Sequence, residues 1–309
     1  MLHRFGKAGR YRLGADTNWR GFIVQAFDYD QAFSRNLGWV RDAEQSRLRQ
    51  ARVAIAGLGG VGGFHLLTLA RLGIGHFTIA DLDVFEVANF NRQAGASQAT
   101  VGRAKVEVLA EMARDINPEC QLALFPDGVS KDNLDEFFQG VDLYVDGLDF
   151  FAFEARERVF AYCAEHRIPA ITVAPLGMSA ALLNFLPGGM TFEDYFQVAG
   201  LPDLEKAVRF LVGLAPALLH RHYLVDQTRV DLKSRRGPST PMACMLCAGV
   251  AGSEALKLLL DRGRVLAAPH GVQFDGYRNK LARTWRPGGN RNPINRLAIA
   301  IARHQLKLD

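Results

Sequence analysis

The sequence has few of the features that mark secreted or membrane-spanning proteins. It has only four cysteines in 309 residues, unevenly spaced, so they do not form a disulfide framework and favour a reducing, cytoplasmic setting. It has no run of about 18 apolar residues, and residues 1–4 do not begin an apolar signal segment. We therefore expect a cytoplasmic protein with no membrane partner.

Concentrated positive charge is also lacking. The formal net charge is +5 and the pI is about 9.1, yet the basic residues are dispersed, and only residues 233–236 form a short basic group. A group of this size is typical of a solvated loop, so we expect no nucleic-acid partner. An acidic protein partner or a nucleotide would explain the charge equally well.

The stretch at residues 52–83 has the most informative pattern that is present. An apolar run at 53–56 ends in the glycine-rich loop GLGGVGG, and a helical pattern then leads to a second apolar run at 77–80, closed by two aspartates. In such a unit the glycines let the backbone approach a phosphate, and the acid can accept a ribose hydroxyl. The pattern predicts a nucleotide site. The alternative is that the glycines only permit close packing of helix and strand.

Strands and helices continue to alternate downstream. Apolar runs at 143–145 and 168–173 are separated by a helical pattern at 153–166. This order predicts an α/β fold with a doubly wound, mainly parallel, Rossmann-like sheet and a C-terminal α/β extension. We divide the chain into an N-terminal arm and helices (1–50), a nucleotide-binding domain (51–185), an inserted segment for partner recognition (186–241), and a C-terminal helix and strand that complete the sheet (242–309).

Several polar groups should meet at the carboxyl ends of the predicted strands, where ligands of such sheets bind. Beside the glycine loop these are the two aspartates of the DLD motif, the segment 89–93, and the pair Asp146 and Asp149 after a later strand. Lys105, one turn into its predicted helix, can point at the same crevice. An arginine, a lysine and a carboxylate near one nucleotide suit phosphate chemistry, because the cations neutralise phosphate and the carboxylate can hold magnesium.

In this order, GLGGVGG, DLD, NxxRQ, GRxK and an aspartate beyond a strand resemble the ThiF/MoeB superfamily, which includes the activating enzymes of sulfur-carrier proteins and ubiquitin. The similarity runs from about Arg35 to Val173 and is traceable through residues 248–259. It implies an adenylyltransferase that binds ATP and Mg²⁺. Such an enzyme adenylates the C-terminal carboxylate of a ubiquitin-like or sulfur-carrier protein, or of a peptide, and releases pyrophosphate.

The resemblance also implies a set of residues that bind ATP. These are Gly57, Gly59, Gly60, Gly62, Asp81, Asp83, Asn89 and Gln93. Within this set the glycines form the phosphate loop, Asp81 binds the ribose, and Gln93 supports the phosphate contacts. From the residues alone, a strand-end cap is the alternative role for Asp81.

The catalytic set implied by the resemblance is Arg92, Lys105, Asp149 and Arg35. Arg92 and Lys105 contact the phosphates, and Asp149 holds the magnesium. Arg35 resembles an N-terminal arginine that reaches the γ-phosphate bound to a neighbouring subunit, which implies a homodimer. A structural ion pair for Arg35, a solvated helix position for Lys105 and a capping role for Asp146 are the alternatives.

The sequence departs from the family pattern in three places. Phe150 replaces the asparagine that usually follows the catalytic aspartate. Only one CxxC pair, Cys244 and Cys247, is present, which is half of a zinc site. No cysteine lies between residues 175 and 241, where a thioester-forming cysteine is expected. The enzyme therefore either stops at the acyl-adenylate or uses Cys244 or Cys247, although free cysteines usually pack as small apolar groups.

Two other classes of function are compatible with a nucleotide fold. One is an oxidoreductase that uses NAD(P) or a flavin. The polar set NFNRQ together with Lys105 argues against it, because these residues have no purpose in hydride transfer. The other is a binding module that has lost turnover, which Phe150 and the missing cysteine leave open.

Overall fold

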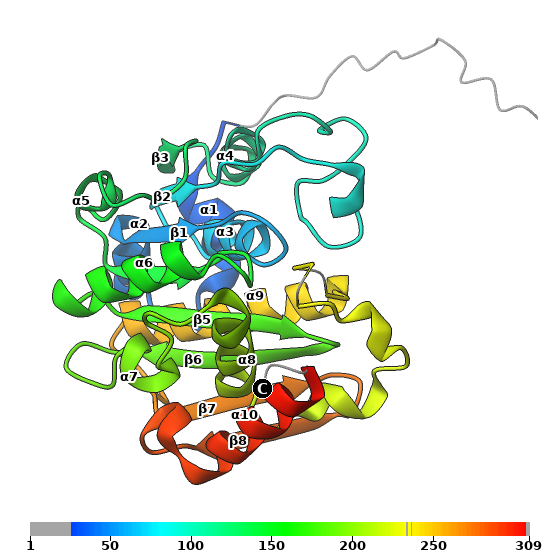
Figure 1. Cartoon of the computed structure of the whole chain (residues 1–309). Coiled ribbons are helices and arrows are strands. Elements are labelled where there is room, and N and C mark those ends of the chain that lie inside the picture. Colours follow the sequence, from blue (N-terminus) through cyan, green and yellow to red (C-terminus); the bar gives the residue numbers. More distant parts are fainter. Residues whose placement is uncertain (1–25, 233, 236, 307–309) are drawn as a thin grey trace, which may run out of the picture.

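The protein is built around one mixed β-sheet. A computed structural model describes residues 26–232, 234–235 and 237–306; residues 1–25 of the predicted arm, and Lys233 and Arg236 of the basic group, lie outside the described residues. The strand order is β3-β2-β1-β4-β5-β6-β7-β8 (Figure 1). The strands are β1 (Arg52–Ala56), β2 (His76–Ala80), β3 (Gln121–Phe125), β4 (Leu143–Asp146), β5 (Ala170–Leu176), β6 (Ser179–Phe185), β7 (His270–Asp275) and β8 (Lys280–Trp285).

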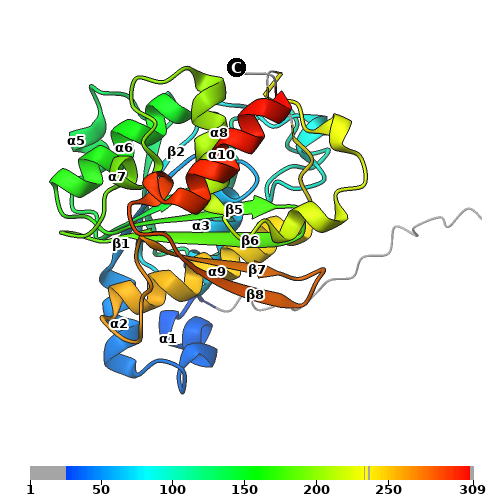
Figure 2. The ribbon, with the colours of Figure 1, turned by 60° about the horizontal axis from the view of Figure 1, so that its bottom comes forward.

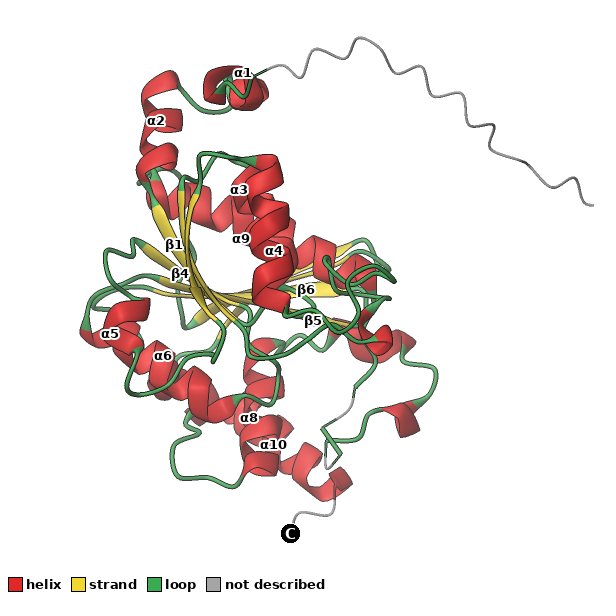
Figure 3. Cartoon of the chain, turned by 90° about the horizontal axis from the view of Figure 1, so that it is seen from above, coloured by secondary structure: helices red, strands yellow, loops and turns green. Residues whose placement is uncertain are grey.

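Helices connect these strands and cover both faces of the sheet. The α-helices of the described residues are α1 (Tyr29–Phe33), α2 (Asp42–Gln50), α3 (Gly62–Arg71), α4 (Lys105–Ile116), α5 (Leu134–Phe137), α6 (Phe153–Glu165), α7 (Phe192–Phe196), α8 (Asp203–Leu214), α9 (Pro241–Leu259) and α10 (Pro293–Leu306). Short 3₁₀ helices are η1 (Ser34–Asn36), η2 (Val87–Asn89), η3 (Leu219–Tyr223), η4 (Gln227–Arg229) and η5 (Gly289–Arg291). Figure 3 shows α3, α4 and α9 on one face and α6, α8 and α10 on the other.

The predicted fold class is confirmed. Strands β1 to β5 are parallel, and β5 to β8 pair antiparallel. Because helices cover both faces, the central strands are apolar runs without alternation: β1 is buried from Val53 to Ala56. Residues from α3, α4 and α9 form the core on one face, and aromatic residues from α6, α7 and α8 dominate the other.

Helix α9 joins the C-terminal extension to the parallel half. Thr240 caps it by accepting a hydrogen bond from the Ala243 amide, and Pro241 occupies the first turn, where it has no backbone bond to lose. Within the described part of the chain, α9 is the one helix long and apolar enough to cross a membrane. It packs against β5, β6 and α3 as a core helix.

Some elements differ from the sequence prediction. The helix predicted to place Lys105 one turn from its start begins at Lys105 itself. The C-terminal extension has two strands where one is predicted, because β8 is a mostly exposed edge strand that mixes apolar residues with Lys280, Arg283 and Thr284. Edge strands of this kind carry no strong hydrophobic signal.

Candidate functional site

The ends of β1, β2 and β4 bring the predicted site together. In the register of the parallel strands, Ala56 lies between Ala80 on one side and Asp146 on the other. The loop after β1 is therefore flanked by the loops after β2 and β4. This is the crevice at the carboxyl ends of the strands where ligands of open α/β sheets bind.

Two of the four predicted phosphate-loop glycines are required by packing. Gly57 has φ +84°, and a Cβ there would lie 2.3 Å from the carbonyl oxygen of Gly147. A Cβ on Gly62 would lie 1.8 Å from the oxygen of Gly57, and a Cβ on Gly147 would lie 2.1 Å from the same oxygen. The loop after β1, the start of α3 and the loop after β4 thus touch backbone to backbone. The sequence analysis did not identify Gly147 as a site residue. The available signal was a glycine directly after Asp146, at the end of a predicted strand.

The other two glycines have no such packing reason. A Cβ on Gly59 would meet nothing nearer than the Gln93 Nε2 at 3.6 Å, and one on Gly60 would meet the Cys244 sulfur at 3.4 Å. These are ordinary contact distances, so a Cβ would fit here. A bare backbone at a helix N-terminus suits the close approach of a phosphate. The packing explanation therefore holds for Gly57 and Gly62 but not for Gly59 and Gly60, whose contact with a phosphate stays a prediction.

Asp81 is engaged with the backbone of the site. Its Oδ2 accepts a hydrogen bond from the Leu58 amide at 2.6 Å, and its Oδ1 accepts one from the Asp83 amide at 2.9 Å. Burial raises the pKa of the Asp81 carboxyl. Asp81 therefore acts as a strand-end cap that ties the glycine loop to β2, and its contact with a ribose stays a prediction.

Lys105 and Asp83 form an ion pair beside this cap. The Lys105 Nζ lies 2.9 Å from the Asp83 Oδ2, with the lysine side chain almost buried and the carboxylate 58% exposed. Lys105 is the first residue of α4, so its side chain is held at the strand ends by the turn that begins the helix. It is not a solvated surface lysine, and its contact with phosphate stays a prediction.

The NxxRQ segment lies against the glycine loop. Asn89 caps η2 by accepting from the Glu86 amide, and the Arg92 guanidinium donates to the Ala88 carbonyl at 2.8 Å. The Arg92 side chain passes close to Gly60, where a Cβ would lie 3.9 Å from its Cγ. Gln93 is buried, and its Oε1 has no hydrogen-bond partner among the described residues. A buried acceptor left unpaired is costly, so this atom is consistent with a ligand that donates to it.

Asp146 and Asp149 have different environments. Asp146 is buried; its Oδ2 accepts from Arg156 Nε at 3.0 Å and from Thr172 Oγ1 at 2.9 Å. Asp149 is exposed, and the one hydrogen bond its carboxylate accepts in the described structure comes from the Phe151 amide at 3.0 Å. Asp146 is thus structural, and Asp149 has a carboxylate available to a ligand.

The donor set around Asp149 fits magnesium only in part. The described residues contain no group of three or more histidines, cysteines, aspartates or glutamates that could hold a metal. Mg²⁺ commonly binds through one or two carboxylates together with substrate phosphates and water. A single exposed carboxylate beside a phosphate loop is compatible with that mode, in which the nucleotide supplies the remaining ligands.

Neither CxxC cysteine is placed as a reactive thiolate. Cys244 and Cys247 are fully buried on α9, and burial raises the pKa of both thiols. A thiol must ionise to act as a nucleophile, so these environments disfavour thioester formation. Cys244 packs against the glycine loop at Gly60, which gives it a structural role.

Arg35 does not join the other site residues within one chain. It is an exposed residue of η1, next to α1, whose Tyr29 hydroxyl donates to the Gly73 carbonyl just before β2 begins. The amino ends of the strands are therefore its neighbours, while the glycine loop lies at the carboxyl ends. Figure 2 shows α1 and α2 projecting from the body at this edge.

Tyr223 and Thr240, in the segment that precedes α9, are tied to the ends of β5 and β7. The Tyr223 hydroxyl accepts from the Met178 amide at 2.8 Å and donates to Asp275 at 2.9 Å. The Thr240 hydroxyl donates to the Gly177 carbonyl at 2.7 Å. Sequence reasoning missed Tyr223 and Asp275; the available signal was an aspartate followed by glycine at a strand end, as at Asp146.

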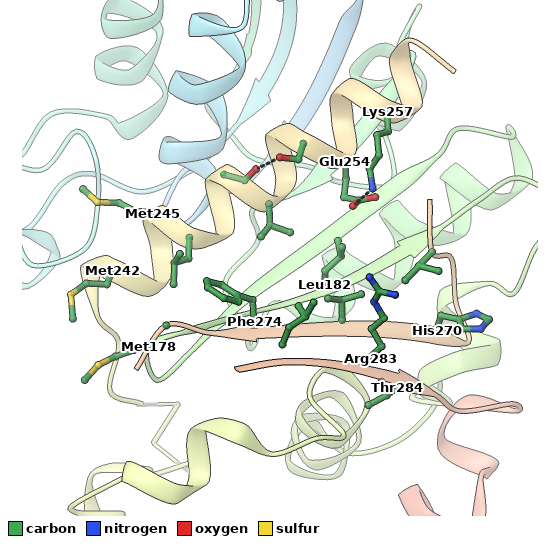
Figure 4. A pocket seen from close by; sticks show the side chains of 18 of the residues that line it. Met178, Leu182, Met242, Met245, Glu254, Lys257, His270, Phe274, Arg283 and Thr284 are labelled. Atoms are coloured by element: carbon green, nitrogen blue, oxygen red, sulfur yellow. Dashed lines mark hydrogen bonds and ion pairs between the residues drawn. The ribbon is translucent and has the colours of Figure 1, made fainter. Parts of the chain in front are cut away.

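A cavity of about 1130 Å³ lies beside this segment, between α9 and the β7–β8 hairpin (Figure 4). Met178, Met242 and Met245 line one end of this α9–β8 groove. The other end contains Glu254, paired with Lys257 at 2.5 Å, together with His270, Arg264 and Arg283. The methionine end is nearest the strand ends, because Met178 lies in the turn after β5 and Met242 in the first turn of α9. The basic end lies toward the opposite edge.

The comparison with known proteins agrees with this arrangement, since the profile of the ThiF family matches residues 33–295. The chain belongs to the ThiF family. This ThiF-family chain is 38% identical over 273 residues to the probable adenylyltransferase/sulfurtransferase MoeZ of Mycobacterium tuberculosis, covering 72% of the chain and 69% of the relative. It is 33% identical over 184 residues to the tRNA threonylcarbamoyladenosine dehydratase of Haemophilus influenzae, covering 59% of the chain and 64% of the relative.

A solved structure of Escherichia coli MccB with ATP has the same fold. The TM-score is 0.61 at 21% identity, over 82% of the ThiF-family chain and 70% of MccB. The matched part spans less than two thirds of the length of some curated relatives, such as the dehydratase at 64%. The predicted superfamily and fold are thus confirmed.

Proposed function

We propose that this ThiF-family chain is an ATP-dependent adenylyltransferase. It would activate the C-terminal carboxylate of a small ubiquitin-like or sulfur-carrier protein, or of a peptide, as an acyl-adenylate with release of pyrophosphate. The observation that carries the proposal is the bare backbone at Gly59 and Gly60, next to Arg92 and the unpaired Gln93 oxygen. The names of MoeZ and of the solved MccB–ATP complex support it.

The proposed roles follow from where the side chains lie. Backbone N–H groups at Gly59 and Gly60 approach the phosphates, and Arg92 and Lys105 offset their negative charge. The carboxylate oxygen of the partner attacks the α-phosphorus; a new P–O bond forms as the bond to pyrophosphate breaks. Mg²⁺, when bound, would be held by Asp149 together with phosphate oxygens and would neutralise charge on the leaving pyrophosphate.

The proposed partner has an apolar surface with acidic side chains near it. The α9–β8 groove offers methionines at the end nearest the nucleotide and basic side chains at the far end. Methionine-rich surfaces adapt to apolar partners, and the basic end favours acidic side chains. We propose that the partner binds here and that residues 186–241 guide its tail to the strand ends.

We also propose a homodimer. Because Arg35 lies at the amino ends of the strands, it can meet a nucleotide only on another copy of the chain. A cytoplasmic location is part of the same proposal, supported by four free, buried cysteines.

The first test is isothermal calorimetry on one preparation of the protein. The binding of ATP, with and without Mg²⁺, is compared with the binding of NAD and of NADP. We expect magnesium-dependent ATP binding and no nicotinamide binding. Tight NAD or NADP binding without ATP binding would instead identify an oxidoreductase.

The second test is ATP–pyrophosphate exchange with candidate carboxylates. Exchange that depends on a peptide or carrier protein with a free C-terminus supports the proposal. Exchange stimulated only by RNA would point to a carboxylate on tRNA, in line with the name of the dehydratase relative. ATP binding with no exchange for any carboxylate would identify an inactive nucleotide-binding module.

A further inference from the structure

Arg156 is a buried arginine whose guanidinium is directed at one loop. It lies on α6, is 2% exposed, and uses all three nitrogens. Its Nε donates to Asp146 at 3.0 Å, and its two terminal nitrogens donate to three consecutive backbone carbonyls. These are Leu148 at 2.7 Å, Asp149 at 2.9 Å and Phe150 at 3.2 Å.

Charge neutralisation alone does not account for this arrangement. Asp146 needs a cation because a buried carboxylate is costly unless it is paired, and Thr172 and the Leu148 amide add further donors to it. A lysine could supply the same charge. The planar fork of an arginine is needed to reach three carbonyls at once, and the Phe210 ring packs against the guanidinium at 4.7 Å.

The loop that Arg156 holds is the one that carries the Asp149 carboxylate. With the carbonyls of 148, 149 and 150 bonded to the guanidinium, the direction of each peptide unit is fixed. On the other side, Gly147 touches Gly57 and Gly62. The loop is thus held between the glycine loop and α6.

We propose that Arg156 is a positioning residue that sets the Asp149 carboxylate at a fixed place relative to the phosphate loop. The inference rests on the proposed function, because the part of Asp149 in nucleotide chemistry is itself proposed. Because its hydrogen bonds go to Asp146 and to the loop carbonyls, Arg156 acts through the loop backbone.

The test is Arg156→Lys, which keeps a charge beside Asp146 but cannot form the fork. Arg158→Lys is the matched control, since Arg158 lies on the same helix in an exposed ion pair with Glu154. Calorimetry should show ATP binding without Mg²⁺ unchanged in both variants. The Mg²⁺ concentration needed to strengthen ATP binding should rise about tenfold in Arg156→Lys only, as expected for lost charge-assisted hydrogen bonds.

Hydrogen exchange on the ligand-free protein gives a second readout. The Phe151 amide, which donates to Asp149, should exchange faster in Arg156→Lys and not in Arg158→Lys. If Arg156→Lys does not fold, Thr172→Val is the substitute, because it removes the hydroxyl that donates to the Asp146 oxygen bound by Arg156. This variant should show a smaller rise in the required Mg²⁺ concentration and a smaller increase in the exchange rate of the Phe151 amide. Equal loss of ATP binding with and without Mg²⁺, or no difference from the control, overturns the inference. Absence of magnesium-dependent ATP binding in the unmutated protein would instead refute the proposed function.

Discussion

At the scale of single residues, the phosphate-loop glycines separate into two kinds that can be tested apart. Gly59→Ala should fold normally, because its Cβ has room, yet bind ATP at least about tenfold more weakly because the methyl group occupies the phosphate approach. Gly62→Ala should unfold at lower temperature or fail to accumulate, because its Cβ would lie 1.8 Å from the Gly57 oxygen. Thermal unfolding and ATP titration of both variants distinguish them. Normal ATP affinity in folded Gly59→Ala would remove the phosphate role from this residue.

His65 predicts a specific acid sensitivity. It is fully buried on α3, and neither ring nitrogen has a hydrogen-bond partner in the part of the chain that the structure describes. Burial lowers its pKa to about 3. Between about pH 6.5 and 3 the unfolded chain therefore binds a proton that the folded chain does not. Stability should fall with falling pH in that window, by up to about 1.4 kcal/mol per pH unit.

The control for this prediction is His65→Leu, which removes the titrating group and fills the same apolar site. Its free energy of unfolding, measured by denaturant titration from pH 7.5 to 4, should depend less steeply on pH than that of the unmutated protein. Parallel curves for the two proteins would show that His65 does not contribute.

At the scale of elements, the hydrogen bonds of Tyr223 should control the order of residues 219–240. Tyr223→Phe removes a donor to the buried Asp275 and an acceptor for the Met178 amide, which should cost about 1–3 kcal/mol. We expect faster hydrogen exchange and proteolysis within 219–240, with ATP affinity unchanged. Tyr277→Phe is a matched control, because the exposed Tyr277 ring packs on Tyr223. If the two variants show equal protection of this segment from exchange and proteolysis, the Tyr223 hydrogen bonds do not control its order.

The elements also show what sequence alone could predict. The unit from β1 to Asp81 was predictable because its strand, glycines, helix and acid are local in the chain. The contact of Gly57 with Gly147 was not, since it joins residues separated by 90 positions and depends on β4 lying beside β1. The contact of Cys244 with Gly60 could not be predicted either, since it depends on α9 packing beside the loop between β1 and α3. Asp81 was predicted at the site, but its bonds to the Leu58 and Asp83 amides follow only from the folded turn.

At the scale of the whole molecule, the placement of Arg35 predicts complementation between subunits. Arg35→Ala and Asp149→Ala should each abolish adenylation alone. A mixed dimer has one site with an intact Asp149 and an intact Arg35 from the other chain, so a 1:1 mixture after subunit exchange should recover about a quarter of the unmutated activity. Pyrophosphate exchange on the mixture measures this.

Two results would contradict the dimer. One is a monomer by sedimentation at the assay concentration, and the other is an inactive mixture after verified subunit exchange. Arg35→Ala should also retain nearly normal ATP affinity, because the chain that binds the nucleotide keeps its own glycine loop.

The backbone contact among Gly57, Gly62 and Gly147 has a consequence for chimeras. A crossover point placed between residues 63 and 146 would take the two sides of this contact from different parents, although each half would look complete in an alignment. Such hybrids should express poorly unless both parents have glycine at all three positions and the same loop lengths. Crossovers after residue 150 leave the trio within one parent, so recombination with relatives should be tolerated mainly in the C-terminal half, where partner preference is proposed to reside.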